Sequence, residues 1–454
     1  MIYSIDPTTE EPLAEYEEYS DNKIINLIEN AEIAFFRYRK TPLSQRTQSM
    51  LRVASVLEKQ KEEYSKLMTL EMGKPIVQSR AEIDKCIWLC NYYCENAEHF
   101  LADEIIQTDA RKSFVSFQPL GIILAVMPWN FPFWQVFRFA VPNLLAGNVC
   151  LLKHSSNVSG TALAIDKIFH DAGFEQHLFT TLLISSSKVK QVIEHSLVKA
   201  VTITGSTPAG KSVASIAGDV LKKSVLELGG SDPYVILEDA DLELAAKSCV
   251  TSRLINGGQS CIAAKRFIIV EKVFEQFKYF FIEEMKSKKI GNPFDEANQI
   301  GPQARIDLRD ELHSQVDKSA AQGAQILLGG FLPEGKGAFY PPTVLTDVDE
   351  HNIAFTEEIF GPVAPLIKAK NEDDAIRLAN KTVFGLGAAV FTKDLEKGEY
   401  IAKEKLLAGS CFVNSFVKSD PRLPFGGINQ SGYGRELGLF GIREFVNIKT
   451  IYVS

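Results

Sequence analysis

The chain has 454 residues, of which 45% are hydrophobic, so it is long enough for two or three domains with real cores. Its 49 basic and 57 acidic residues give a net charge of −8 without long runs of one sign, which argues against nucleic acid and anionic membranes as partners. The acidic N-terminus has no apolar signal core, and no window reaches the roughly 18 apolar residues of a membrane span. We therefore expect a cytoplasmic protein.

The cysteines and histidines predict neither disulfides nor a metal site. The seven cysteines are odd in number and lack CxxC spacing, and the seven histidines show no HExxH-like spacing. Cys86, Cys90 and Cys94 recur every four residues, so they share one helix face, where we expect them to pack in the core.

In chain order, the first pattern is helical and runs from Asp21 to about Phe100, where apolar residues recur every three or four positions. The segments Arg111–Gly121 and Val446–Ser454 alternate like exposed strands, and they pair either with each other or with another subunit. Between them, apolar strands alternate with helices. The predicted strands are 122–127, 148–152 and 200–203, and the predicted helices are 134–146, 161–172 and 189–195.

This alternation predicts an α/β protein whose first domain is a doubly wound parallel sheet of the dinucleotide-binding type. A second α/β region follows, with strands predicted at 266–270, 361–367, 388–391 and 410–413 and helices at 273–286, 307–323, 371–380 and 395–405. We place the boundary near Gly229 and Gly230. A hinge there sets Glu227 and Cys261 on opposite walls of an interdomain cleft, where small-molecule sites commonly lie.

A glycine turn follows the strand that ends at Thr204. Gly205 makes the turn, Ser206 caps the next helix and Pro208 lies in its first turn. The free backbone N–H groups of such a helix start attract pyrophosphate. The pattern itself is common, so its position among the other motifs gives it weight.

Two segments carry the chemistry. Cys261 follows Asn256-Gly-Gly-Gln-Ser on a glycine-rich loop, where a substrate carbon can approach the thiol and backbone N–H groups can meet an oxyanion. Glu227 ends an apolar run just before Gly229 and Gly230, so it is either a base with a raised pKa or a carboxylate paired with Lys222 or Lys223. Together they fit a thiol nucleophile with a carboxylate that activates water.

These residues stand within motifs that resemble the aldehyde dehydrogenase superfamily. The motifs run in the family's order over nearly the whole chain, and in detail they are most similar to short bacterial succinate semialdehyde dehydrogenases. They are Pro128-Trp-Asn-Phe-Pro, Thr204-Gly-Ser, Leu226-Glu-Leu-Gly-Gly, Gly258-Gln-Ser-Cys, Glu357-Glu-Ile-Phe-Gly-Pro, Pro424-Phe-Gly-Gly and Ser431-Gly-Tyr-Gly-Arg-Glu.

The resemblance implies the aldehyde dehydrogenase fold and its division of the chain. A dinucleotide-binding domain comprises residues 1–110 and 122–229, and a catalytic domain comprises 230–422. Residues 111–121 and 440–454 form a β oligomerisation arm, so a homo-oligomer is expected. In the cofactor site, Trp129 and Leu228 line the nicotinamide, and Glu358 and Phe360 hold its ribose.

The end of the second predicted strand, Lys153-His-Ser-Ser156, bears on the choice of cofactor. An acidic residue near this strand end binds the 2′-hydroxyl of NAD and repels a 2′-phosphate. Many relatives carry glutamate where this chain has Ser156, and Lys153 adds positive charge. We therefore predict NADP over NAD; the alternative is that Lys153 binds the ribose and both cofactors bind.

The predicted mechanism begins with attack of the Cys261 thiolate on an aldehyde. Asn130 and the backbone N–H of Cys261 hold the oxyanion, hydride transfer gives a thioester, and water activated by Glu227 hydrolyses it. Glu436 matches a second carboxylate of the family. It either lies near the path of the hydrolytic water or has a structural role, in which it pairs with Arg435 or with a neighbouring chain.

The substrate site is predicted from Asn130, Trp134 and Arg138, which lie four apart along one side of a helix. Arg138 and Ser419 replace aromatic residues of many relatives, so a carboxylate at the far end of a short aldehyde, such as succinate semialdehyde, would meet both. Alternatively, Arg138 pairs with an acidic side chain and the pocket takes neutral or longer aldehydes.

Three rival functions remain at this point. A coenzyme-A-acylating dehydrogenase is disfavoured by Glu227, because activated water would hydrolyse the thioester first. A cysteine hydrolase needs a histidine base, and His154 lies in the cofactor segment instead. An idle binding or structural protein on this scaffold is disfavoured by the presence of Asn130, Glu227 and Cys261 together.

Overall fold

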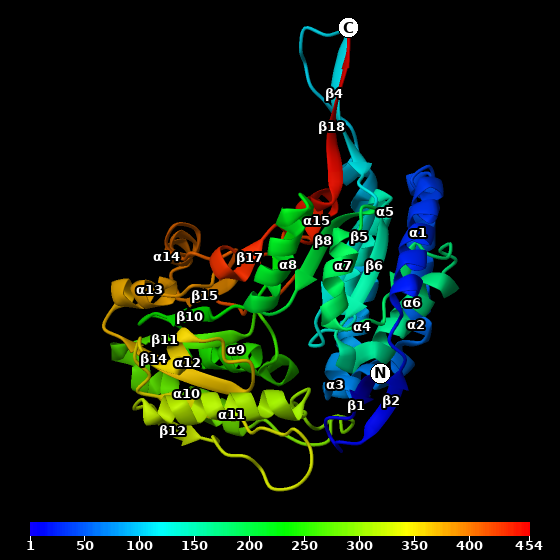
Figure 1. The fold of residues 1–454 in the computed structure, drawn as a ribbon. Helices are drawn as coiled ribbons and strands as arrows, with labels where there is room; N and C mark the ends of the chain where they lie inside the picture. The colour runs from blue at the N-terminus through cyan, green and yellow to red at the C-terminus, as the bar shows by residue number, and fades with distance from the viewer.

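The computed structural model describes residues 1–454 as two lobes, each built on a mostly parallel sheet, and an arm that projects from the first lobe (Figure 1). The α/β fold is thus confirmed. None of its helices combines the length and the apolar composition needed to cross a bilayer.

The first lobe is organised around a six-stranded sheet with the order β17-β9-β8-β5-β6-β7, in which only β17 is antiparallel to its neighbour. Its strands are β5 (Ile122–Met127), β6 (Val149–His154), β7 (Phe179–Thr181), β8 (Val198–Thr204), β9 (Lys223–Glu227) and β17 (Gly432–Tyr433). The helices around it are α1 (Asp21–Tyr38), α2 (Leu43–Lys59), α3 (Lys61–Met72), α4 (Ile76–Leu101), α5 (Trp134–Ala146), α6 (Ser159–Asp171), α7 (Val189–Glu194), α8 (Thr207–Asp219) and α15 (Gly438–Glu444). A small hairpin of β1 (Ile2–Ile5) and β2 (Pro12–Tyr16) completes this lobe.

The second lobe contains a seven-stranded sheet with the order β12-β13-β14-β11-β10-β15-β16, parallel except for β12. Its strands are β10 (Asp232–Ile236), β11 (Ala264–Val270), β12 (Gln325–Leu328), β13 (Thr343–Thr346), β14 (Val363–Ala369), β15 (Gly387–Phe391) and β16 (Ser410–Val413). Its helices are α9 (Leu242–Leu254), α10 (Phe274–Lys286), α11 (Ile306–Ala321), α12 (Ile353–Thr356), α13 (Glu372–Asn380) and α14 (Leu395–Tyr400).

Alternate residues of β10 enter different cores. Tyr234 and Ile236 belong to the cluster on one face of the sheet, whereas Val235 and Leu237, the residue after the strand, belong to the cluster on the other. A parallel sheet covered by helices on both faces needs such continuous apolar strands. This is why the apolar runs could be read from the sequence.

The arm pairs the two alternating segments with each other. β4 (Lys112–Pro119) and β18 (Val446–Val453) are antiparallel in unbroken register, and β3 (Glu104–Ile105) adds a short third strand. The C-terminus lies at the tip of this arm (Figure 1).

The strand β9 ends at Glu227 in the first sheet and β10 begins at Asp232 in the second, so the chain passes from one sheet to the other through Gly229 and Gly230. The sequence did not reveal that β17 returns to the first sheet and pairs Gly432 with Glu227. A strand of two residues carries no periodicity to recognise.

Candidate functional site

The loop before Cys261 is held in a conformation that needs its asparagine and glycines. Asn256, Gly257 and Gly258 have φ values of 53°, 61° and 80°, which side chains other than Asn and Gly rarely adopt. A Cβ on Gly258 would lie 2.2 Å from the carbonyl oxygen of Gly361. The side-chain amide of Asn256 donates to the carbonyls of Asn130 (2.7 Å) and Gln259 (3.2 Å), which ties this loop to the Asn130 segment.

Cys261 lies between two cavities and borders both. Its side chain is half-buried, and burial raises the pKa of the thiol to about 11, against the lowering effect of Lys265 and Arg138. The resting thiol is therefore protonated at neutral pH, and attack on a substrate requires that a base take its proton.

Lys265 supports this loop, a role that its place in the sequence does not indicate. Its buried amino group donates to the carbonyls of Ser260 (2.9 Å) and Cys261 (2.7 Å) and pairs with Glu358 at 3.1 Å. It lies four residues after the cysteine, but nothing in the local pattern indicates that it folds back.

The first cavity, of about 300 Å³, collects the predicted nicotinamide and ribose residues. Those that line it are Trp129, Asn130, Gly205, Ser206, Leu228, Glu358 and Phe360, together with Cys261. The rings of Trp129 and Phe360 meet edge to face with centroids 5.9 Å apart. The helix α8 begins beside this cavity with Ser206 as its N-cap and proline in its first turn, as predicted.

Lys153 and Ser156 do not line this cavity, but they follow the same edge of the sheet. Lys153 is in β6 next to Val126 of β5, near the carboxyl ends of both strands, and Ser156 is exposed just beyond. Lys153 is half-buried, burial lowers its pKa, and it forms no hydrogen bond or ion pair within the chain. An unpaired lysine at this edge suits an anionic ligand.

The second cavity, of about 110 Å³, contains the predicted substrate residues Trp134, Arg138 and Ser419. It also contains Lys85 from α4, which the sequence analysis did not single out. The indole N–H of Trp134 donates to the Ser419 hydroxyl (3.1 Å), and so does the Lys85 ammonium (2.8 Å).

Arg138 is 2% exposed and forms an ion pair with Glu436. Its guanidinium lies 4.6 Å from the centroid of the Phe425 ring. Pairing with an acidic side chain, the alternative left open for Arg138, is thus what the structure shows. Glu436 pairs with Arg138 and not with Arg435, which donates instead to the carbonyls of Gly427 and Gly434.

Glu227 is buried against this ion pair. Burial and the nearby Glu436 carboxylate raise its pKa well above the ordinary value, against the effects of Arg138 and Arg435. Neither carboxylate oxygen has a hydrogen-bond partner, and a Cβ on Gly426 would lie 2.8 Å from Oε1. Burial without a hydrogen bond therefore favours the neutral form of this acid.

The expected surroundings of Glu227 differ from those observed in two respects. It lines neither cavity that Cys261 borders, because its side chain packs within the first lobe. The pairing with Lys222 or Lys223 does not occur, since Lys222 binds the carbonyls of Ile193 and His195 while Lys223 pairs with Glu444. Its role as a base stays a prediction and requires the side chain to turn toward Cys261.

Asn130 is placed to polarise a substrate oxygen. It lines the first cavity beside Cys261, and its side-chain amide donates one hydrogen bond to the Gln259 carbonyl (3.1 Å). Since an amide nitrogen carries two hydrogens, the second is free for an oxyanion.

The remaining titratable groups offer no second catalytic centre beside Cys261. His154 lies between the carbonyls of Met127 and Pro132, and burial lowers its pKa to about 4, so it does not serve as a base for the thiol. All seven cysteines are free, and no group of three or more His, Cys, Asp or Glu side chains could hold a metal ion.

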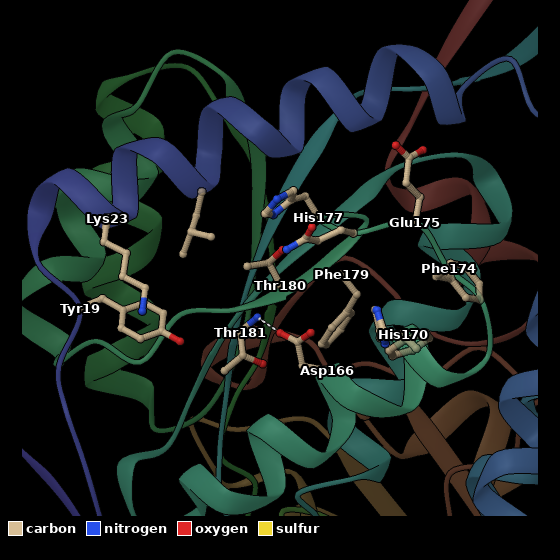
Figure 2. A pocket seen from close by; sticks show the side chains of 13 residues that line it. Tyr19, Lys23, Asp166, His170, Phe174, Glu175, His177, Phe179, Thr180 and Thr181 are labelled. Carbon is tan, nitrogen blue, oxygen red and sulfur yellow. Dashed lines mark hydrogen bonds between the residues drawn. The ribbon is translucent and has the colours of Figure 1, made fainter.

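A separate cavity of about 180 Å³ contains none of the predicted site residues (Figure 2). Figure 2 shows Asp166, whose carboxylate accepts a hydrogen bond from the Thr181 backbone at 2.6 Å, and the two histidines His170 and His177 that also line this cavity. This cavity lies at the outer edge of the first sheet, beside β7.

Comparison with known proteins gives a consistent result over the whole chain. The model of the aldehyde dehydrogenase family matches residues 1–451. The chain is 47% identical over 453 residues to a probable succinate-semialdehyde dehydrogenase [NADP(+)] from Synechocystis, with 100% of each chain covered. It is 46% identical to a succinate semialdehyde dehydrogenase [NAD(P)+] from Escherichia coli, covering 99% of this chain and 97% of that one.

A solved structure supports the same grouping. The crystal structure of succinic semialdehyde dehydrogenase from Streptococcus pyogenes, in complex with NADP+, superposes with a TM-score of 0.98 at 36% identity and covers 100% of both chains.

Proposed function

The chain belongs to the aldehyde dehydrogenase family, and on that premise we propose that it oxidises succinate semialdehyde to succinate with NADP as the preferred cofactor. One observation carries this proposal: Cys261 separates a cavity with the family's cofactor residues from a small cavity that contains cations and no acidic side chain. The relatives named for this reaction support the same substrate.

The cofactor fits the residues present. The start of α8 supplies free backbone N–H groups for a pyrophosphate, and Glu358 and Phe360 border the region assigned to the ribose. The unpaired Lys153 and the exposed Ser156 hydroxyl leave charge and a donor for a 2′-phosphate, where a carboxylate would favour NAD. When bound, the nicotinamide supplies the hydride acceptor that turns a thiohemiacetal into a thioester.

The chain's own groups perform the remaining steps. The Cys261 thiol gives its proton to solvent water and its sulfur forms a bond to the aldehyde carbon, and the free N–H of Asn130 and the backbone N–H of Cys261 stabilise the oxyanion. Removal of one such oxyanion donor lowers kcat by about 10²–10³-fold. After oxidation, Glu227 turns from its buried position and releases its own proton to solvent. The carboxylate then takes a proton from water, and the resulting hydroxide attacks the thioester carbon and releases the acid from sulfur.

The mobility of Glu227 is part of this proposal. In its resting position the carboxyl is protonated beside Glu436, where it has no hydrogen-bond partner to break when it moves. On leaving Glu436 for the cavity, its pKa falls toward the ordinary range, so the same group becomes a base.

The assembly and location remain predictions. The arm exposes apolar side chains, among them Ile105, Ile448 and Tyr452, and a free-standing ribbon with such surface is suited to pairing with a second copy. We therefore propose a homo-oligomer, either a dimer or a tetramer, in the cytoplasm.

The test follows NADPH formation by absorbance. Succinate semialdehyde, its five-carbon homologue and butyraldehyde are compared with NADP and NAD, each with and without coenzyme A. The expected outcome is the highest kcat/KM with succinate semialdehyde and NADP, with no dependence on coenzyme A. Equal efficiency with butyraldehyde would favour the general aldehyde dehydrogenase, and a requirement for coenzyme A would contradict water as the acceptor.

A further inference from the structure

We propose that the ammonium of Lys85, seated on Ser419 and Trp134, is the cation that binds the distal carboxylate of the aldehyde acid, in place of the guanidinium of Arg138. This inference rests on the proposed function, because it names the residue that selects an acidic aldehyde.

The balance of charge in the small cavity leaves Lys85 as its half-buried, unpaired cation. Lys85, Arg138 and Lys418 all line this cavity. Arg138 is already neutralised by Glu436, and Lys418 is exposed to solvent at the rim. Lys85 forms no ion pair, and its one hydrogen-bond acceptor within the chain is the neutral Ser419 hydroxyl. A half-buried cation without a counter-ion has lost part of its hydration, so an entering carboxylate gains by pairing with it.

The contact between Lys85 and Ser419 leaves two free donor groups side by side. The ammonium donates to Ser419 Oγ at 2.8 Å, and the indole N–H of Trp134 donates to the same oxygen at 3.1 Å. A hydroxyl oxygen accepts two hydrogen bonds, so Ser419 retains its own hydrogen as a free donor. The ammonium, 4.1 Å from the Trp134 ring centroid, retains two of its three hydrogens. A carboxylate can accept one bond from each side chain.

The position of this pair sets the length of the substrate. Cys261 and Lys85 border the same cavity, whose volume is only about 110 Å³. An aldehyde carbon at the sulfur and a carboxylate at the ammonium therefore belong to one short molecule.

Binding of a carboxylate is coupled to the charge of Lys85. Burial lowers the pKa of Lys85 to about 8, and nearby Arg138 adds to this shift, while Cys86, Glu82 and Asp420 oppose it. Lys418 also faces the cavity, at its rim. Above pH 8 the free enzyme loses the ammonium, so affinity for an acidic aldehyde falls, whereas affinity for a neutral aldehyde of the same length does not.

The test compares Lys85→Met with wild type on succinate semialdehyde and butyraldehyde, which differ in the carboxylate. The expected result is a rise in KM for succinate semialdehyde of about 10- to 100-fold, with KM and kcat for butyraldehyde within about twofold. The ratio of the two kcat/KM values falls above pH 8 in wild type and becomes flat in the variant. This ratio cancels the titration of Cys261 and Glu227, which serve both aldehydes.

The Lys418→Met variant tests whether any positive charge near the cavity has the same effect as the ammonium of Lys85 that is held by Ser419. If it lowers the preference for succinate semialdehyde as much as Lys85→Met does, or if Lys85→Met affects both aldehydes equally, the assignment is overturned. Should Lys85→Met fail to fold, Lys85→Gln keeps a donor without charge and gives the same comparison. Equal efficiency of wild type on both aldehydes would refute the proposed substrate, whereas a preference that survives Lys85→Met refutes only the role of Lys85.

Discussion

Replacing Glu227 by glutamine separates the first half of the reaction from the second. In the resting structure the Glu227 carboxyl is buried and without hydrogen bonds, and burial raises its pKa, which favours the protonated form. A glutamine of nearly the same shape therefore replaces a neutral acid by a neutral amide, and Cys261, Asn130 and both cavities are left intact. The variant should bind cofactor and aldehyde and form the thioester.

The expected loss lies in hydrolysis alone. A general base contributes about 10²–10⁴-fold, so steady-state kcat should fall by that factor while the first turnover persists. Stopped-flow absorbance should record a burst of NADPH close to one per active site, followed by slow turnover. If burst and turnover fell together, Glu227 would instead deprotonate Cys261 or support the fold.

The same variant makes a prediction about stability. The folded-state pKa of Glu227 is raised above its unfolded value, so its contribution to stability is present at low pH and is lost as pH rises through the folded pKa. Glutamine does not titrate. The melting temperature of the variant relative to wild type should therefore increase with pH above about 4.3, and a difference that does not vary with pH would contradict the buried, neutral state.

Three other substitutions test separate parts of the site. Ser156→Glu should lower the kcat/KM ratio of NADP to NAD by about 100-fold, because a carboxylate beside the 2′-phosphate repels it; an unchanged ratio would place the phosphate elsewhere. Lys265→Met should raise the pH at which Cys261 is alkylated by iodoacetamide, since Lys265 lowers the thiol pKa, whereas the exposed Lys272→Met should not. Gly258→Ala should cost about 2–4 kcal/mol in urea unfolding, because it combines a positive φ with a clash against Gly361. Gly335→Ala has a φ of 104° but meets nothing within 4 Å, so a cost equal to that of Gly258→Ala would contradict the role of the clash.

The sequence predicted those features that depend on local pattern. The bounds of β5 and α5 agree with the predicted segments 122–127 and 134–146. β5 is a continuous apolar run, and α5 is a mostly apolar segment that ends just before Gly147. The two alternating segments indicated the arm, whose strands do pair with each other. The family resemblance is confirmed over residues 1–451.

The features that the sequence did not predict depend on contacts between distant segments. Lys85 is one polar residue on a long amphipathic helix, and only the fold brings it to Ser419. The partner of Arg138 could be expected to be acidic, but only the return of the chain to β9 places Glu436 beside it. The resting position of Glu227 follows from that same return, since Gly426 and Glu436 enclose its carboxyl.

The central claim is that Cys261 carries the acyl group and that water activated by Glu227 removes it. The most direct test mixes the Glu227→Gln variant with NADP and succinate semialdehyde, quenches the reaction with acid after the burst, and measures the tryptic peptide of residues 254–265 by mass spectrometry. The account predicts that this peptide gains the mass of one succinyl group on Cys261, and that the gain is absent without NADP and in a Cys261→Ser variant. An unmodified peptide from an enzyme that has completed its burst would contradict it.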